Sequence, residues 1–265
     1  MKIVVCAKQV PDTNEVKLDP VKGTLIRDGV PSIINPDDKN AIEAALQIKD
    51  QIPGTTVTVI SMGPPQADVA LREALAMGAD EAILVSDRKF GGADTWATSS
   101  TIAGAIKKVG DYDLVITGRQ AIDGDTAQVG PQIAEHLGLP QVSYAEGIEV
   151  CGDYLKVQRQ FEDRYHVIKI KMPCVLTAIA ELNDPRYMTV SGIVSAYDDK
   201  TVTTWTYEEL KDFVDESNLG LKGSPTNVKQ SFTKQPKPAG TVLKDLTPDE
   251  AVSAIVAKLK EKYII

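Results

Sequence analysis

Short apolar runs alternate with helical patterns through the first 140 residues, and this alternation limits the folds that the chain can adopt. The expected strands are short and apolar throughout, as in a sheet buried on both faces; they span Ile3–Ala7, Thr56–Ile60, Ala82–Val85 and Asp113–Thr117. The expected helices span Pro36–Lys49, Pro65–Met77, Thr95–Val109 and Thr126–Leu137. We therefore predict an α/β fold, a mostly parallel, doubly wound sheet with helices on both faces.

The pattern changes after Pro140. Apolar and polar residues alternate in 153–160 and again in Tyr165–Lys171, on either side of Phe161–Arg164. Alternation of period two around a short polar segment predicts an antiparallel β-hairpin. A further apolar run, Pro173–Ala180, predicts another buried strand.

The C-terminal part has a different composition. We expect a nucleotide-binding domain over 1–190, with the hairpin at about 150–172, and a distinct region over 191–265 that includes an extended arm rich in Pro, Gly and Ser at Gly220–Gly240. Residues 221–265 carry eight lysines and four acidic residues, about +4, in a chain of net charge -8. A final amphipathic helix is expected at Pro248–Lys262, with one apolar face formed by Val252, Ile255, Val256 and Leu259. This helix either folds back on the sheet or reaches onto a partner.

Composition narrows the function classes. A chain with pI near 4.9 does not favour nucleic acid or an anionic membrane as a main partner. The three cysteines lie far apart without a CxxC motif, which indicates reduced thiols and no metal site. The N-terminus has no signal-peptide layout and no apolar stretch has membrane-spanning length, so we expect a cytoplasmic protein. No nucleophile–base pair is apparent, and we predict no catalytic side chain; a bound redox cofactor would fit that pattern.

The segment Gly118–Gly130 is the strongest local signal, because it follows an expected strand and opens an expected helix. A glycine in this place lets backbone approach a ligand. We expect Asp125 to cap the helix with Gln128 as its capping-box partner, and Asp123 and Asp125 to hold loop amides while Thr126 and main-chain N–H groups face a phosphate. An ordinary capped helix is the alternative. The segment contains neither a Walker lysine nor a GxGxxG motif.

Two other helix starts belong to the same predicted sheet edge. Asn35–Asp38 combines an Asn N-cap, a Pro at the first helical position and two acids in the first turn. The segment Asp87–Ser100 contains Gly91, Gly92 and small hydroxyl residues, which would form a low wall beside a flat ligand or a pyrophosphate. Both segments also have purely structural explanations, as a capped helix and as a flexible loop capped by Asp94.

Taken together, these motifs resemble one family, the beta subunits of electron transfer flavoproteins. The resemblance covers nearly the whole chain. Its pieces occur in the family's order, and they are Val5–Thr13, Asn35–Pro36, Ser61–Pro64, Ala74–Asp80, Gly118–Val129 and Leu182–Tyr187.

The resemblance implies a two-chain protein. A larger alpha subunit holds a redox FAD, and the beta subunit binds an adenine nucleotide in its own crevice. Carried over motif by motif, the cofactor contacts here would be Ala7, Asn35, Pro36, Asp37, Asp38, Met62, Gly118, Arg119, Gln120, Ala121, Ile122, Asp123, Gly124, Asp125, Thr126, Ala127, Gln128 and Val129. The segment resembling the loop that recognises an acyl-CoA dehydrogenase comprises Leu182, Asn183, Pro185, Arg186 and Tyr187. The basic C-terminal arm would wrap the alpha subunit.

The identity of the nucleotide stays open between FAD and AMP. Ordinary members of the family hold a structural AMP, whereas a bifurcating subgroup holds a second FAD. That FAD takes a hydride from NADH and divides the electrons between the alpha-subunit FAD and a low-potential ferredoxin or flavodoxin. The loop residues Phe90, Gly91, Gly92, Asp94 and Thr95 resemble the bifurcating subgroup and would face flavin and NADH. NADH oxidation would then belong to the heterodimer and not to this chain alone.

Two alternatives to the bifurcating interpretation are a structural AMP-bound subunit and a non-redox ATP- or AMP-binding sensor domain. The role of Arg119 is equally open. This residue could face the edge of a flavin or lie on the surface.

Overall fold

The computed structural model describes residues 1–12, 31–226, 228–229 and 237–265. It divides into two compact units, Met1–Lys229 and Gln230–Ile265. Thr13 of the first family motif and residues 227 and 230–236 of the expected arm lie outside the described residues.

A nine-stranded sheet forms the centre of the first unit, in the order β11-β5-β4-β1-β6-β10-β7-β8-β9 within the described part of the chain. Its parallel strands are β1 Lys2–Cys6, β4 Thr56–Met62, β5 Glu81–Val85, β6 Leu114–Gly118, β10 Cys174–Ala178 and β11 Val202–Trp205. The strand β7 Gln141–Cys151 pairs in parallel with β10 and then antiparallel with β8 Tyr154–Gln160, which pairs antiparallel with β9 Tyr165–Lys171. The predicted mostly parallel sheet and its hairpin are confirmed.

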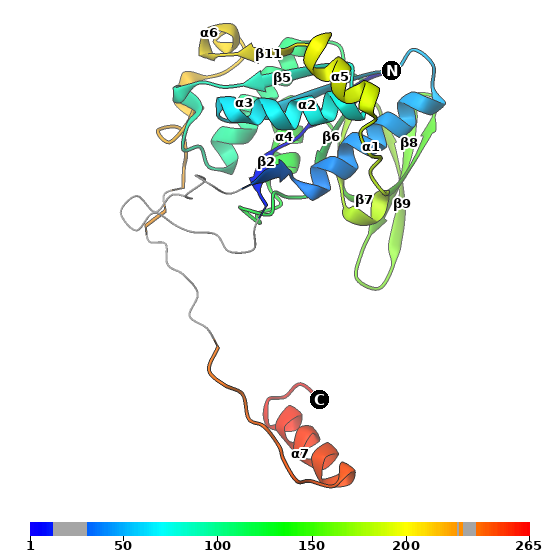
Figure 1. Ribbon diagram of the computed structural model, residues 1–265, viewed down its shortest axis with the longest axis vertical. Coiled ribbons are helices and arrows are strands. Elements are labelled where there is room, and N and C mark those ends of the chain that lie inside the picture. Colours follow the sequence, from blue (N-terminus) through cyan, green and yellow to red (C-terminus); the bar gives the residue numbers. More distant parts are fainter. Residues whose placement is uncertain (13–30, 227, 230–236) are drawn as a thin grey trace. The chain divides into compact units, whose positions relative to one another are not determined.

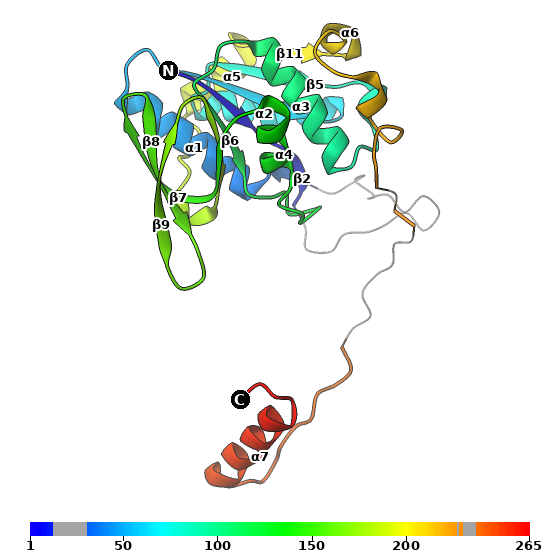
Figure 2. The ribbon, with the colours of Figure 1, turned by 180° about the vertical axis from the view of Figure 1, so that it is seen from behind.

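Helices cover both faces of this sheet (Figures 1 and 2). The helices α1 Pro36–Gln51 and α2 Asp68–Met77 lie on one face, and α3 Thr95–Val109 and α4 Val129–Leu137 lie on the other. Alternate residues of β1 show the same division, because Ile3 and Val5 join the core beneath α1 and α2, whereas Val4 and Cys6 join the core beneath α3 and α4. Burial on both sides explains why the strands are apolar throughout.

The remaining elements include several that the sequence patterns did not indicate. These are the two-stranded sheet of β2 Gln9–Pro11 and β3 Ser32–Ile34, the long strand β7, and the 3-10 turns η2 Arg88–Phe90, η3 Ala180–Leu182 and η4 Glu216–Asn218. The predicted helix Pro65–Met77 begins with a 3-10 turn, η1 Pro65–Ala67, and continues as α2. In residues 190–210, where no strand or helix was predicted, the chain forms α5 Val190–Asp198, β11 and α6 Tyr207–Leu210.

The second unit contains α7 Pro248–Glu261, close to the predicted span. Its start is a complete capping box, in which Thr247 and Glu250 each bond the backbone of the other and Pro248 occupies the first turn. Among the described residues of this unit α7 is the only helix or strand, so the unit contains no second element to cover its apolar face.

In the described residues, no helix combines the length and the apolar character needed to cross a bilayer.

Candidate functional site

A cleft of about 1050 Å³ opens where β1, β4, β5 and β6 end. Its walls are the segments that follow these four strands, namely Cys6–Gln9, 62–67, 85–95 and Thr117–Gly130. The carboxyl ends of parallel strands are where doubly wound sheets bind ligands, because loops and helix starts gather there. The volume lies at the upper end of the range for small-molecule sites.

Two glycines permit close backbone packing beside the cleft. A Cβ atom on Gly118 would meet the carboxylate and backbone of Asp38, and its amide donates a hydrogen bond to Asp38 Oδ1 at 2.9 Å. A Cβ atom on Gly130 would lie 2.6 Å from Thr117 Oγ1 and 2.7 Å from Thr177 Cγ2. Glycine is therefore required for α1 to approach β6 and for α4 to begin against the sheet.

The loop after β6 differs from the predicted capped helix. Helix α4 begins at Val129, three residues later than Thr126, and Gln128 occupies the N-cap position without a side-chain cap. Asp125 and Ala127 have left-handed backbone conformations, with φ of 54° and 52°. A right-handed helix cannot run through such residues, so the prediction of Asp125 as N-cap and Gln128 as capping-box partner is wrong.

The two aspartates of this loop bind side chains and not the loop amides that we expected. Lys8 Nζ lies 2.7 Å and 2.9 Å from the two carboxylate oxygens of Asp123, whose side chain is only 6% exposed. Asp125 accepts a hydrogen bond from the side-chain amide of Gln120. Between described residues, the amides of Thr126, Ala127 and Gln128 donate no hydrogen bond, so the loop and the first turn of α4 offer open N–H groups to an anion.

The predicted start of α1 is confirmed, because Asn35 occupies the N-cap position, with a proline and two acids in the first turn. The Asn35 side chain, however, makes no cap hydrogen bond. It donates instead to the carbonyl of Gln120 at 2.8 Å and accepts from the amide of Ile122 at 3.0 Å. Asn35 thus fixes the loop after β6 to the start of α1.

The acids in the first turn of α1 are buried and perform different tasks. The carboxylate of Asp38 accepts from the amide of Lys8 at 2.8 Å as well as from Gly118, and burial raises its pKa to about 7. Asp37 lies 3.3 Å from Arg119, and burial raises its pKa although the guanidinium opposes the shift. The structure places Arg119 in this half-buried ion pair and not among the residues that line the cleft.

The cleft collects most of the predicted cofactor residues. Those that line it are Ala7, Asp38, Met62, Gly118, Gln120, Ala121, Gly124, Asp125, Thr126, Ala127, Gln128 and Val129. Those outside the lining are Asn35, Pro36, Asp37, Arg119, Ile122 and Asp123. Sequence reasoning did not select Lys8, Gln9, Thr98 and Thr117, which also line it. Only their positions in the sequence could have indicated these four residues, because each lies at or near a predicted strand end or helix start.

All five residues of the expected flavin-facing loop line the cleft, but two of them also have structural roles. Phe90 is 3% exposed and belongs to the core beneath α3. Asp94 caps α3 by accepting from the amide of Ala97 at 3.0 Å. Gly91, Gly92 and Thr95 contribute only small groups to this wall of the cleft, which Arg88 and Phe90 also line.

The expected partner-recognition residues do not form one exposed patch. Leu182 packs against the core, Asn183 exchanges hydrogen bonds with Asn40, and Pro185 is half-buried. Arg186 binds Glu43 and Asp50 of α1. Tyr187 alone is fully accessible, at 95% exposure, and it leads into α5.

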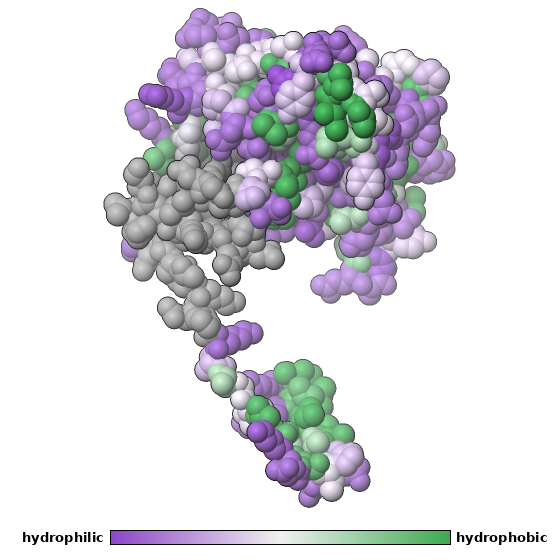
Figure 3. All heavy atoms as spheres, viewed as in Figure 1, coloured by the Kyte–Doolittle hydropathy of each residue, from purple (hydrophilic) through white to green (hydrophobic). Residues whose placement is uncertain are grey.

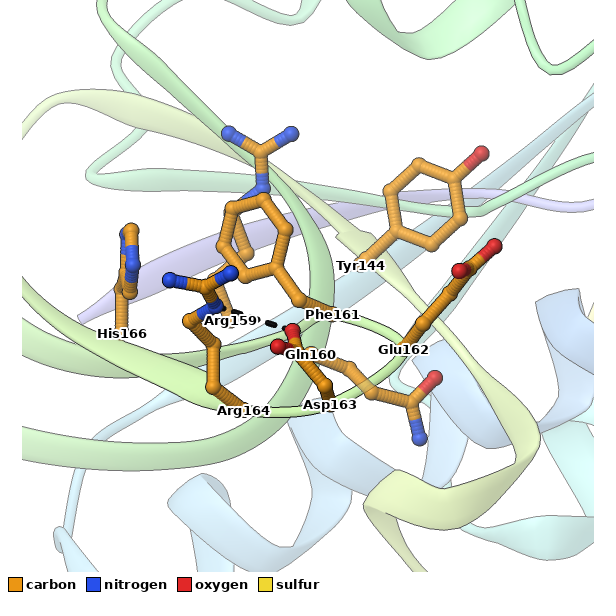
Figure 4. Close-up of a pocket in the computed structure, with 8 residues that line it drawn as sticks. All are labelled: Tyr144, Arg159, Gln160, Phe161, Glu162, Asp163, Arg164 and His166. Carbon is orange, nitrogen blue, oxygen red and sulfur yellow. Dashed lines mark hydrogen bonds and ion pairs between the residues drawn. The ribbon is translucent and has the colours of Figure 1, made fainter.

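A second hollow, of about 640 Å³, lies at the tip of the β8–β9 hairpin (Figure 4). Figure 4 shows the Phe161 ring between His166 and Tyr144. The Arg159 guanidinium carbon is 4.9 Å from the centroid of that ring, and the His166 ring is 4.5 Å from it. Stacking within the turn accounts for this arrangement, and none of the predicted site residues lies here.

The fold and the cleft define an α/β protein of the doubly wound class with a nucleotide-sized site at the carboxyl edge of its sheet. The family model for the electron transfer flavoprotein domain matches residues 22–209. The chain therefore belongs to the electron transfer flavoprotein family, as its motifs led us to expect.

Three relatives align with the whole of this chain and with all of their own length. The electron transfer flavoprotein subunit beta of Clostridium acetobutylicum is 64% identical over 265 residues. The caffeyl-CoA reductase-Etf complex subunit CarD of Acetobacterium woodii is 58% identical over 265 residues. The acryloyl-CoA reductase electron transfer subunit gamma of Anaerotignum propionicum is 50% identical over 271 residues. The resemblance to the beta subunits is thus confirmed, and electron transfer is the role of the family.

Proposed function

We propose that this chain is the beta subunit of a cytoplasmic electron transfer flavoprotein that holds FAD in the cleft and takes electrons from NADH. With an alpha subunit, it passes them by electron bifurcation to an acyl-CoA dehydrogenase and to a low-potential ferredoxin or flavodoxin. The observation that carries the proposal is the cleft of about 1050 Å³, because one of its walls offers open amides and another contains the consecutive glycines Gly91 and Gly92. An adenine mononucleotide would fill only part of that space.

The loop after β6 suits the diphosphate. The amides of Thr126, Ala127 and Gln128 donate no hydrogen bond between described residues, and the first turn of α4 adds further N–H groups together with the positive end of the helix dipole. The carboxylates of Asp38 and Asp123 are committed to Gly118 and Lys8, so they shape the loop without opposing the anion directly.

The loop after β5 suits the ring system. Gly91 and Gly92 leave a flat approach on this side of the cleft, and Thr95 and Thr98 provide hydroxyls. When bound, FAD would supply the conversion between two-electron and one-electron transfer. The residues of this chain would hold the cofactor, orient it and exclude water from its reactive face.

An exposed apolar strip on α5 suits a protein partner (Figure 3). Figure 3 shows an apolar patch over α5. We call it the α5 strip; its exposed residues are Val190, Ile193, Val194 and Tyr197 of α5, with Tyr187 and Met188 directly before the helix. Arg72 secures α5 by donating to the carbonyl of Ala196 at 2.6 Å, so the strip is presented on a fixed helix. We propose that it docks the acyl-CoA dehydrogenase, continuing the Tyr187 end of the expected recognition segment. Two relatives carry acyl-CoA reductases in their names, which supports this class of partner.

The second unit suits the alpha subunit. In the described part of this unit, α7 is an amphipathic helix that follows a lysine-rich segment and has no second helix or strand to cover it, which is typical of a docking segment. We therefore propose that the arm binds the alpha subunit, which is the second of the two alternatives stated for the final helix.

Flavin stoichiometry tests the proposal. The purified heterodimer of this chain and its alpha subunit should contain two FAD molecules, and NADH should bleach the visible flavin absorbance anaerobically. In the Gly118→Ala variant, the added Cβ atom would meet Asp38, so its heterodimer should lose the FAD of the cleft and keep the FAD of the alpha subunit. One flavin with bound AMP, and no reaction with NADH, would instead identify the non-bifurcating subunit; bound ATP or AMP with no flavin would identify a sensor domain.

A further inference from the structure

The two carboxylate oxygens of Asp94 accept hydrogen bonds from two different segments of the chain. Its Oδ1 accepts from the amide of Ala97 and so starts α3, while its Oδ2 accepts from the amide of Thr226 at 3.0 Å and from the hydroxyl of Thr226 at 2.7 Å. The amide of Asp94 itself donates to the Ser224 hydroxyl at 2.8 Å. A residue that lines the cleft is thereby bonded to a segment 130 residues further along the chain.

That segment, residues 219–226, lies along the loop after β5, and we call it the bracket. The amide of Leu221 donates to the carbonyl of Gly91 at 3.0 Å. Gly220 has φ of 57°, and a Cβ atom on it would collide with the carbonyl of Lys89. An added Cβ on Gly92 would lie 3.2 Å from the Leu221 side chain. The two backbones therefore meet at distances that only glycine allows.

The bracket is also closed on itself. Ser224 Oγ donates to the carbonyl of Gly220 at 2.8 Å, and the amide of Gly223 donates to the carbonyl of Leu219 at 2.9 Å. Leu219 is 4% exposed and belongs to the core beneath α3, and Ser224 is 9% exposed. The bracket is thus anchored in the sheet domain independently of the cleft.

No residue of the bracket lines the cleft in the described structure, whereas the loop that it holds, 85–95, forms one wall. We propose that Asp94 is a positioning residue through which the bracket fixes this wall, so that order in the bracket and nucleotide binding in the cleft are coupled. The ligand part of this proposal rests on the proposed function; the fixing of the wall does not.

The electrostatics of Asp94 agree with this role. Burial opposes ionisation of the carboxyl, but the hydrogen bonds from Ala97 and Thr226 together outweigh it and lower the pKa. The carboxyl is therefore a charged acceptor for both donors at neutral pH, and hydrogen bonds to a charged group are stronger than those between neutral groups.

Coupling between two sites is reciprocal. A nucleotide that stabilises the loop 85–95 should also protect the bracket, and a bracket that is loosened should weaken nucleotide binding. Since the bracket directly precedes the segment leading to α7, nucleotide binding in the cleft would also stabilise the residues at which the arm begins.

The test uses the full heterodimer and two hydroxyl deletions outside the cleft, Ser224→Ala combined with Thr226→Val. Without added nucleotide, amide hydrogen exchange in 87–95 should become about tenfold faster. After removal of bound nucleotide, titration should give dissociation constants for FAD and AMP that are about tenfold higher, which corresponds to a loss of roughly 1.4 kcal/mol of binding free energy. A matched control, Thr203→Val with Ser253→Ala, removes one hydroxyl of each type from exposed residues of β11 and α7. Its exchange and affinity should stay at the wild-type values.

A conservative variant separates positioning from general destabilisation. Thr226→Ser keeps the hydroxyl, so this single variant should retain wild-type exchange in 87–95, whereas Thr226→Val alone should not. Unchanged exchange in the double variant, or no difference between the Ser and Val substitutions, would overturn the proposal. If the wild-type heterodimer bound neither FAD nor AMP in the cleft, the proposed function would fail, while the exchange measurement would still decide whether Asp94 and the bracket fix the wall.

Discussion

Individual polar side chains around the cleft hold one backbone segment to another. Asp38 joins the ends of β1 and β6, Asn35 joins the start of α1 to the loop after β6, and Lys8 closes that loop from the other side through Asp123. Buried polar groups with good partners fix a single arrangement, and losing one partner leaves the other unsatisfied. These residues therefore shape the site even where they do not line it.

The Asp38→Asn substitution should destabilise the fold by about 1–3 kcal/mol, because its side-chain NH₂ would have to face the amide of Lys8 or of Gly118. The measurement is chemical denaturation of the full chain. The control is Asp111→Asn, at a carboxylate that is 95% exposed, which should leave the free energy of unfolding within about 0.5 kcal/mol of the wild type.

The pH dependence of stability has a definite sign at Asp38. Burial raises the pKa of this carboxyl to about 7 in the folded state, above its ordinary value of about 3.9. The folded state binds more protons between these values, so the contribution of Asp38 is fully present below about pH 4 and is lost as the pH rises through about 7. Unfolding free energies measured from pH 4 to 8 should contain this falling component in the wild type and lack it in Asp38→Asn; an identical profile in both would refute the assignment.

The Lys8→Met substitution should loosen the loop after β6, since Asp123 is nearly buried and would lose its cation. We expect nucleotide affinity to fall about tenfold, equivalent to roughly 1.4 kcal/mol, in a titration of the heterodimer with FAD. Lys39→Met removes a lysine that is paired at the same 2.7 Å distance with Glu73 away from the cleft, and it should bind FAD normally. Equal affinity in the two variants would show that the Lys8–Asp123 pair has no role in the site.

Among the helices of the first unit, α5 differs most clearly in how little of its apolar surface is buried. The other long helices of the first unit bury one apolar face against the sheet, but α5 buries only Ala196 and leaves valines and a tyrosine exposed. Gly192 lets α5 approach α2 closely, because a Cβ atom on it would meet the carbonyl of Ala76. An exposed apolar surface on a fixed helix is typical of an interaction site.

The Val190→Glu substitution places a charge in the α5 strip, at a residue that is 80% exposed. The fold should be unaffected, while electron transfer from the heterodimer to the acyl-CoA dehydrogenase should drop at least tenfold through a higher apparent KM, because a desolvated charge opposes docking. Reduction by NADH should be unchanged. Thr203→Glu introduces the same charge on β11 and serves as the control; a similar loss in both would count against docking at α5.

At the level of the whole molecule, the chain combines a sheet domain that has its own core with a second unit whose described residues contain one helix without buried residues. Below about 40 residues, a segment seldom folds stably without a partner or a covalent staple. The second unit, Gln230–Ile265, is of that size, and its helix has strong capping signals but no neighbouring element in the described residues. Its stability should therefore depend on what covers α7.

Replacing Val252 and Ile255 together by Asp should prevent stable association with the alpha subunit, measured by size-exclusion chromatography and by titration, with a loss of at least 100-fold in affinity. Both residues are more than half exposed, so the sheet domain should keep its melting temperature. Replacing the exposed Lys258 and Lys260 by Gln changes the polar side of the helix and should reduce association far less. Normal complex formation by the Asp variant would contradict the role of α7.

The fold was predictable where local patterns coincide with tertiary burial. Five of the six parallel strands, all except β11, are short apolar runs because both faces are covered, and these five were expected from that feature. The strand β7 was missed because it is half-buried and changes partner midway, with an irregularity between Ala145 and Gly147. The strand β11 was missed because only Val202 of its four residues is buried.

The sequence alone determined the sheet class, the hairpin, the terminal helix and the family, since period, glycine placement and ordered motifs are properties of neighbouring residues. Only the tertiary structure decided where α4 begins, which partners Asn35, Asp38 and Asp123 take, and that residues 219–226 hold the cleft wall. The physical reason is that a polar side chain has several local partners of similar strength, and the choice among them depends on which distant backbone groups the folded sheet brings within hydrogen-bonding distance.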